Sequence, residues 1–373
     1  MMEVRFLHRD EVEQCLTFFN AMHGVRRTVE QWRWEFESRA FTPDEVPHAV
    51  VKDQGKVVGS QALIPIRLID ERGVFWTAKS EATVLDPEYR GQGLFDRMYE
   101  LMFEYADRHQ LAFIWGFTQA VKPLRKVGFQ IPAHTTQLLF PFSRSAITRL
   151  LPRRASGQLS DAARRQFLAV GSSMAAALAT VRLNLTVRRL RRLKGARSIS
   201  IRTLEHAPPD AGDLCARFIE CWGGTTIYRD ADYLEWRLFR NPFLKSIFRA
   251  AYDGDRLVGW VAFAIGDDGI AYLVDILAVD SSGGRYKVAE LVEKLLIEAV
   301  LGARNMGAVA IRGWHVNAHP FDQVILRVAR RVGFLHVRKG YAMVVYAGPS
   351  AAERGGSSDD WYVNRVYTEG ILG

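Results

Sequence analysis

The sequence predicts an α/β chain made of two similar domains joined by a basic helical segment. Short apolar runs alternate with helical patterns, and the same order of segments returns about 200 residues later. Positive charge gathers between the two copies. With 373 residues, 48% hydrophobic and 11% aromatic, the chain is long enough for two ordinary domains with separate cores.

The first half reads as strands and helices in turn. Apolar runs begin at Ala49, Lys56 and Ala82, and each ends at Gly, Asp or Pro, which favours strands over helices. Residues 94–108 place apolar side chains at helical spacing, and residues 111–117 return to strand character.

The second half repeats this order. Lys56-Val57-Val58-Gly59 parallels Arg256-Leu257-Val258-Gly259. Residues 31–36 parallel 233–238, and 125–129 parallel 330–334. Three matches in one order, at nearly constant offset, indicate a duplicated domain rather than two unrelated domains.

The predicted boundaries are 1–142 for the first domain, 143–200 for the basic connector, 201–347 for the second domain and 348–373 for a tail. Gly355-Gly356-Ser357-Ser358-Asp359-Asp360 reads as a mobile loop. Residues 361–364 are too apolar to stay in water, so we expect them to pack back.

The stretch with most chemical information follows the strand that ends at Val84-Leu85. After Asp86-Pro87 comes Arg90-Gly91-Gln92-Gly93-Leu94, where two glycines lead into an amphipathic helix. Glycines allow close backbone approach, the helix start supplies unpaired N–H groups, and Arg90 adds a cation. These features suit a pyrophosphate. The alternative is a turn that needs glycine only for its conformation. A dinucleotide fingerprint fits poorly, because Asp96 stands where its third glycine belongs.

At these residues the sequence resembles the GNAT superfamily of N-acyltransferases. Its pyrophosphate motif, Arg or Gln, two residues, Gly, one residue, then Gly or Ala, matches Arg90 onward except at Phe95. Val127-Gly128-Phe129 resembles the end of the family's last helix. The resemblance covers most of 45–140 and, more faintly, 245–346. It implies two tandem GNAT-like domains with mixed sheets, and acyl-CoA, acetyl-CoA first, bound by Val84, Leu85 and residues 90–94.

The second copy lacks this loop. Aligning Val279-Asp280 with Leu85-Asp86 puts Gly284 opposite Arg90 and Lys287 opposite Gly93. We therefore expect one acyl-CoA per chain, with the second domain shaping the acceptor site. No metal-ligand spacing is present, so no metal is expected.

The resemblance maps the backbone N–H that polarises the thioester carbonyl to Thr83. It places the base a few residues earlier on the same strand, and strand alternation puts Lys79, Glu81 and Thr83 on one face. Glu81 is the candidate base. The alternative is that Glu81 is solvated or paired with Lys79.

The family's frequent general acid, a Tyr, is replaced by Leu124. The thiolate leaves unassisted, or a tyrosine such as Tyr341 substitutes. If Glu81 is structural, the aligned acid Asp275 and then His315 are the next candidate bases.

The net charge of +9 is local, because residues 144–202 hold fourteen Lys and Arg against one acid. No nucleic-acid partner is expected. Residues 182–194 mix leucines and arginines at roughly helical spacing. Such a helix can lie on an anionic membrane or dock an acidic carrier protein, and the alternative is a solvated bridge between domains.

The predicted function is transfer of an acyl group, acetyl first, from acyl-CoA to an amine of a small or lipid-linked acceptor. Alternatives are transfer from an acyl carrier protein or a long-chain donor, and an inactive scaffold that only binds. With no signal peptide pattern and no long apolar run, we expect a cytoplasmic protein, peripheral to the inner face of the membrane if the connector binds lipid.

Overall fold

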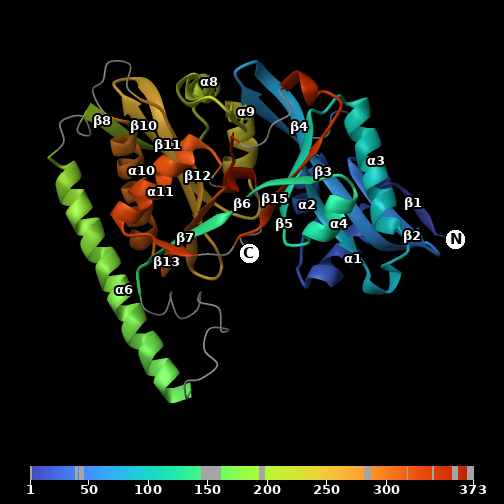
Figure 1. The fold of residues 1–373 in the computed structure, drawn as a ribbon, viewed down its shortest axis with the longest axis horizontal. Helices are drawn as coiled ribbons and strands as arrows, with labels where there is room; N and C mark the ends of the chain where they lie inside the picture. The colour runs from blue at the N-terminus through green and yellow to red at the C-terminus, as the bar shows by residue number, and fades with distance from the viewer. Residues whose placement is uncertain are drawn as a thin grey trace. The chain divides into compact units, whose positions relative to one another are not determined.

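The computed structural model describes residues 2–37, 41, 46–143, 161–192, 198–280, 287–316, 318–337, 340–354 and 360–367, with the side chains of 161–170 and of a few terminal positions excepted. It contains two compact units, each with its own mixed sheet and helices (Figure 1). The predicted α/β class with two mixed sheets is confirmed.

Unit 1 comprises residues 1–134, 225–228 and 341–361. Its main sheet path runs β1-β2-β3-β4-β5-β15-β6, and β4 and β5 are parallel neighbours. The strands are β1 (Glu3–Phe6), β2 (His48–Asp53), β3 (Lys56–Asp70), β4 (Gly73–Leu85), β5 (Phe113–Thr118), β6 (Gln130–His134), β9 (Thr225–Ile227), β15 (Ala342–Ala347) and β16 (Trp361–Tyr362). The helices are α1 (Val12–His23), α2 (Val29–Trp32), α3 (Leu94–Arg108) and α4 (Val121–Lys126).

Unit 2 comprises residues 135–224, 229–340 and 362–373. Its sheet runs β14-β7-β13-β12-β11-β10-β8. The strands are β7 (Thr136–Pro141), β8 (Ile199–Leu204), β10 (Ser246–Asp253), β11 (Arg256–Ile265), β12 (Ile270–Ala278), β13 (Ala310–His315) and β14 (Leu335–Val337). The helices are α6 (Asp161–Leu190), α8 (Ala211–Trp222), α9 (Ala231–Leu234), α10 (Val288–Asn305) and α11 (Pro320–Val332).

The segments that repeat in sequence also repeat in structure. Lys56 and Arg256 each begin a strand after a tight turn. Helices α2 and α9 both continue as a π-helical turn, at Arg33–Glu37 and Glu235–Phe239. Both closing glycines have positive φ, 98° for Gly128 and 122° for Gly333. This shared local geometry agrees with a duplicated domain.

The two copies exchange one strand each. β15 belongs to the second repeat of the sequence, yet it pairs with β5 and β6 in the sheet of unit 1. β7 comes from the first repeat and pairs with β13 and β14 in the sheet of unit 2. The boundaries predicted at 142 and 347 therefore describe the sequence repeat, whereas each compact unit draws on both repeats.

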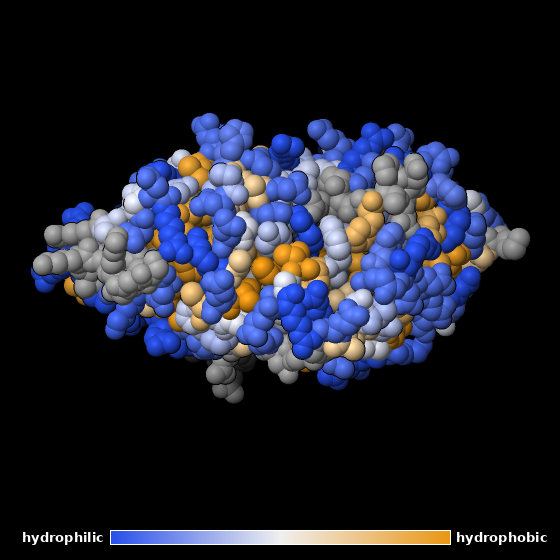
Figure 2. Space-filling model, turned by 90° about the horizontal axis from the view of Figure 1, so that it is seen from above, coloured by the Kyte–Doolittle hydropathy of each residue, from blue (hydrophilic) through white to orange (hydrophobic). Residues whose placement is uncertain are grey.

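The core of unit 1 lies between the sheet and α3. Met98, Met102 and Tyr105 of α3 pack against Ala49 and Leu63 of the sheet. Helix α1 covers the other face of the sheet, where the Cys15 thiol lies 3.6 Å from the His48 ring. One exterior face, seen in Figure 2, is largely hydrophilic with apolar side chains in small groups. Within the described residues, no helix is long and apolar enough to cross a bilayer.

The tail returns to the body of the protein, as expected for residues 361–364. Trp361, Tyr362, Val363 and Asn364 are all buried. The mobile loop predicted at residues 355–360 lies almost entirely outside the described residues.

The exchange predicts that the first repeat cannot fold alone. A fragment of residues 1–200 lacks β15, so β6 loses its described sheet partner and β5 loses the neighbour that pairs with all six of its residues. We expect this fragment to lack a cooperative unfolding transition and near-ultraviolet circular dichroism. Co-expression with residues 201–373 should restore both. A fragment 1–200 that unfolds cooperatively by itself would contradict the exchange.

Two buried histidines predict acid sensitivity. Burial, with Arg27 nearby, lowers the pKa of His48 to about 3, and burial, with His336 and Arg330, lowers the pKa of His315 to about 4. An unfolded histidine titrates near 6.5, so below that pH the unfolded chain binds protons that the folded chain refuses. The free energy of unfolding should therefore fall as pH drops from 6.5 to 5, by about 1.4 kcal/mol per histidine per pH unit.

Denaturant unfolding at pH 7, 6 and 5 measures this slope. His48→Gln should reduce it by about half. His134→Gln, at an exposed position, should leave it unchanged. An equal slope in His48→Gln would show that His48 is not the source.

Candidate active site

The two-glycine loop follows β4 and opens α3. The Asp86 carboxylate accepts the Glu88 N–H at 3.0 Å, which fixes the turn after the strand. Gly91 and Gly93 have φ of 80° and 75°, a region that L side chains rarely adopt. A Cβ on either glycine would meet no atom within 4 Å, so both face open space. The sequence therefore needs glycine here for backbone conformation, and the backbone it exposes is accessible.

The start of α3 can receive an anion. Gly93 is the N-cap residue, and no side chain caps this end of the helix. The first N–H groups of α3 thus have no capping side chain, and the helix dipole adds positive potential. Arg90 is exposed beside them and makes only long contacts, 3.3–3.4 Å, to the Leu85 carbonyl. The loop, the helix end and the guanidinium together fit a phosphate group.

The strands that lead to this loop separate from each other. β4 and β5 pair at Ala78 with Ile114 and at Lys79 with Trp115, and no further. Both strands continue, β4 to Leu85 and β5 to Thr118. The β4 edge beyond Ser80 therefore has no strand partner on the β5 side, and an extended ligand can lie there.

A β-bulge coincides with this separation. Ser60 of β3 pairs with Val84, whereas Ala62 pairs with Glu81, so one residue of β3 faces two of β4. Ala82 has a φ of 51°, and its carbonyl accepts the Ser60 hydroxyl at 2.9 Å. The bulge reverses the alternation of side chains beyond this point.

The bulge makes one prediction wrong, namely that Thr83 shares a face with Lys79 and Glu81. The Thr83 hydroxyl lies 3.3 Å from the Tyr99 hydroxyl, and the Ser80 hydroxyl lies 3.0 Å from the same atom. Thr83 and Ser80 therefore share the α3 side. Strand alternation failed because Ala82 is an extra residue in the ladder.

The structure adds three residues that sequence reasoning missed. Gln61 accepts the Thr83 hydroxyl and donates to Ser80 at 2.9 Å. Tyr99, wholly buried on α3, contacts both hydroxyls, and burial raises its pKa. The Thr83 hydroxyl thus contacts Gln61 and Tyr99, and both of these also contact Ser80. Tyr99 occupies one of the apolar positions of its helix, so its spacing predicts a core residue and gives no sign of a role in the site.

Glu81 is mostly buried and contacts the Lys79 ammonium. Lys79 is itself buried at the last residue pair of β4 with β5. The ion pair is the alternative that the sequence left open for Glu81. Because the carboxylate still lies on the strand that carries the site, its position is compatible both with pairing to Lys79 and with acting as the base.

The position of the family's usual general acid is apolar. Leu124 of α4 is buried in the core of unit 1. Tyr341 is exposed and stands next to Ala342, which pairs with Thr118 at the end of β5. It therefore lies at the end of the sheet where β4 and β5 have separated.

Unit 2 has the same split but fills it. β12 and β13 pair only as far as Tyr272 with Arg312. Beyond that point the Tyr362 hydroxyl donates to the Ile276 carbonyl and the Asn364 amide donates to Asp275 at 2.6 Å. The segment Arg365–Tyr367 contacts both strands. The chain's own tail thus occupies the gap.

The helix start of unit 2 is also occupied. The Asp280 carboxylate accepts the Val288 N–H at 2.6 Å, at the beginning of α10. Lys287, aligned with Gly93, has extended backbone with φ −94° and ψ 144°. The loop residues 281–286, Gly284 among them, lie outside the described residues.

Asp275 is unsuited to act as a base. Both of its oxygens accept from the Arg229 guanidinium, at 3.0 and 3.2 Å, and it also accepts from Trp260 at 2.8 Å. Its side chain and that of Arg229 are fully buried. His315 is buried in the same unit. Among the described residues, no group of three or more His, Cys, Asp or Glu could hold a metal ion.

Comparison with known proteins identifies one domain in the sequence. Residues 3–131 match the sequence model of the acetyltransferase (GNAT) domain. No curated protein matches the chain.

Solved structures match in fold over most of the chain. A GCN5-related N-acetyltransferase from Anabaena variabilis has a TM-score of 0.58 at 11% identity, covering 93% of this chain and 73% of its own. N-myristoyltransferase from Saccharomyces cerevisiae with bound myristoyl-CoA has a TM-score of 0.57 at 12% identity, covering 93% and 79%. A GCN5-related N-acetyltransferase from Kribbella flavida has a TM-score of 0.54 at 13% identity, covering 93% and 71%.

At these identities the structural likeness shows the fold and nothing beyond it. The sequence match is independent of that likeness, and it spans the two-glycine loop, the bulge and the separated strands. The part of the chain that the comparisons assign to a family is thus residues 3–131, a GNAT acetyltransferase domain, and the chain as a whole shares its fold with the solved structures named above.

Proposed function

We propose that this protein transfers an acyl group, an acetyl group in the first instance, from acyl-CoA to the amine of a small or lipid-linked acceptor. The observation that carries the proposal is that two features follow each other directly on one stretch of chain. The separated end of β4 leads directly into the uncapped, glycine-opened start of α3. An extended donor with a phosphate-bearing end needs both features at this spacing.

The loop residues would hold the pyrophosphate. Gly91, Gln92, Gly93 and Leu94 would supply backbone N–H groups, and Arg90 would supply a mobile cation. Asp96 lies in the first turn of α3, where its charge would oppose an anion, but it is paired with the Lys126 ammonium. The Lys126 ammonium thereby offsets the charge of Asp96.

Val84 and Leu85 would hold the extended arm of the donor. They pair with Ser60 and Gly59 of β3 on one side and have no β5 partner on the other. An unpaired strand edge recognises an extended chain with amide groups through backbone hydrogen bonds. When bound, acyl-CoA supplies the activated thioester.

Thr83 and Glu81 would carry the chemistry of the protein itself. The backbone N–H of Thr83 would polarise the thioester carbonyl, and the contacts of the Thr83 hydroxyl with Gln61 and Tyr99 help to fix this residue. A donor that stabilises developing negative charge must be held in place beforehand. Glu81 would take the proton of the acceptor amine, directly or through a water. The burial of Leu124 leaves the thiolate to depart unassisted, or with Tyr341 as the acid.

The donor and the existence of turnover are tested together. Release of the coenzyme A thiol is measured with acetyl-, medium- and long-chain acyl-CoA over a panel of amines, and in parallel with acyl carrier protein. We expect release from acyl-CoA, fastest with acetyl. Activity with acyl carrier protein alone would favour that alternative. Binding of acyl-CoA without release from any donor would identify a scaffold that lacks activity.

The loop predicts one acyl-CoA site per chain, because the equivalent gap and helix start of unit 2 are occupied by Tyr362, Asn364 and Asp280. Gly93→Asp should abolish binding, since it puts a side chain and a negative charge against the pyrophosphate. Calorimetry should give about one site in the natural protein.

Gly55→Asp is the matched control, because Gly55 is also left-handed, with φ 82°, and also faces open space in unit 1. It should bind as the natural protein does. Two sites per chain, or full binding by Gly93→Asp, would refute the assignment.

Glu81→Gln keeps the shape of the side chain but cannot accept a proton. We expect turnover to fall by roughly 10²–10⁴ while acyl-CoA affinity stays nearly constant. The acidic limb of the pH–rate profile should flatten as well. Stopped assays of thiol release across pH 5–9 measure both quantities.

Glu100→Gln, on the exposed side of α3, serves as the control and should keep full turnover. If Glu81→Gln is stable and active with the acidic limb intact, Glu81 only pairs with Lys79.

A further inference from the structure

Helix α6 has an inner face that is fixed to unit 2. Ala179, Leu183 and Leu190 are buried on it. The Thr186 hydroxyl reaches the Arg331 carbonyl at 3.3 Å, and the helix packs on α10, α11 and β7. Figure 1 shows α6 running beside α11 and continuing past it. Leu183 and Leu190 of the segment 182–194 are therefore buried against the protein and do not face outward.

The opposite face of α6 is apolar and open. Met174, Leu178, Val181 and Leu185 are 68%, 50%, 52% and 58% exposed. Their spacings of four, three and four residues place them on one line of the helix. They are four of the seven large apolar side chains that are strongly exposed in the described part of the chain, so exposed apolar side chains are concentrated on this helix.

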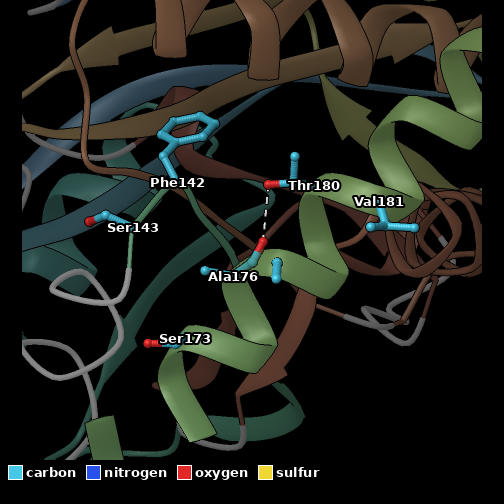
Figure 3. A pocket seen from close by; sticks show the side chains of 7 residues that line it. Phe142, Ser143, Ser173, Ala176, Thr180 and Val181 are labelled. Carbon is cyan, nitrogen blue, oxygen red and sulfur yellow. Dashed lines mark hydrogen bonds between the residues drawn. The ribbon is translucent and has the colours of Figure 1, made fainter. Parts of the chain in front are cut away.

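A hollow flanks this stripe and extends its uncharged surface. It has a volume of about 530 Å³ and is lined by Phe142, Ser143, Ser173, Ala176, Ala177, Thr180 and Val181. Figure 3 shows Ala176 and Thr180 on α6 with Phe142 across from them, and the Thr180 hydroxyl donates to the Ala176 carbonyl at 3.0 Å. None of the side chains that line the hollow is charged.

Arginines border the stripe. Arg182 and Arg188 are exposed on the same helix, and Arg192 is exposed in the turn that follows it. Residues 144–202 contain one acid, Asp161, against fourteen basic residues. Arg189 instead contacts the Glu293 carboxylate.

The combination separates three classes of occupant. An acidic carrier protein would pair with the arginines, but it would not explain why four apolar side chains are exposed. A second copy would bury the stripe but would bring like charges together. A bilayer with anionic headgroups satisfies both, because apolar side chains enter the interface while guanidinium groups bind phosphates.

We propose that the outward face of α6 and of the turn after it docks the protein on an anionic phospholipid surface. Its apolar stripe is Met174, Leu178, Val181 and Leu185, and its charges are Arg182, Arg188 and Arg192. The proposal does not depend on acyl transfer. Fixed against unit 2 on its inner face, α6 presents the stripe without having to unfold or detach.

The test is co-sedimentation of the full chain with vesicles of phosphatidylcholine, with and without phosphatidylglycerol. We expect binding to the anionic vesicles only, and a steep fall as salt rises from about 0.1 to about 0.5 M. Changing the stripe to serine (M174S, L178S, V181S, L185S) should weaken binding by about tenfold or more, as should Arg182→Gln, Arg188→Gln and Arg192→Gln combined.

Control variants isolate the face. Val74→Ser with Met306→Ser removes exposed apolar side chains elsewhere and should leave vesicle binding unchanged. Replacing the three arginines by lysine should keep most of it. Thermal unfolding midpoints near that of the natural protein show that the serine variant is folded.

Three results would overturn the proposal. They are equal vesicle binding by the folded serine variant, binding of acidic carrier protein but not vesicles, and stripe-dependent self-association without vesicle binding. Thiol release with a water-soluble amine, measured on the same variants, should be unchanged. Loss of vesicle binding is thereby distinguished from failure of the proposed acyl transfer.

Discussion

The site depends on the separation of two parallel strands, and that separation coincides with a single strained residue. Ala82 adopts a left-handed conformation that costs a non-glycine residue on the order of 1–3 kcal/mol. Pairing with β3 on both sides of the bulge, and the hydrogen bond from Ser60 to the Ala82 carbonyl, hold it in place. Because the ladder gains a residue there, Thr83 turns toward Tyr99, and the free end of β4 runs into the glycine loop.

The second copy shows what the same architecture becomes when it no longer needs to be open. It has a bulge in the matching pair of strands, where Val274 of β12 is the extra residue between the pairs Ala262–Asp275 and Phe263–Leu273, and it has an equivalent split. Internal groups take the place of a ligand in both parts of the gap, Asp280 at the helix start and the tail between the strands. The buried ion pair of Arg229 and Asp275 then has a structural role, since removing either partner would leave an uncompensated buried charge.

Sequence patterns predicted what is set locally. The glycine loop, the helix that follows it and the three repeated segments depend on nearby residues, so they were readable. The bulge could not be predicted, because alanine at position 82 carries no signal of a left-handed backbone. The strand exchange could not be predicted either, because β7 and β15 have the sequence pattern of ordinary strands in either sheet. On α6 the leucines looked alike in sequence, and only packing distinguishes buried Leu183 from exposed Leu185.

The exchange also gives a physical reason for keeping a copy without an open site. β15 contributes Met343, Val344 and Val345 to the sheet of unit 1, where all three are buried. In the sequence, β15 belongs to the second repeat. A chain that lost the second repeat would expose the apolar edge of β5 and leave β6 without its described sheet partner. A ligand that stabilises unit 1 should accordingly raise the unfolding temperature of the whole chain, because neither sheet can be completed without residues from both repeats.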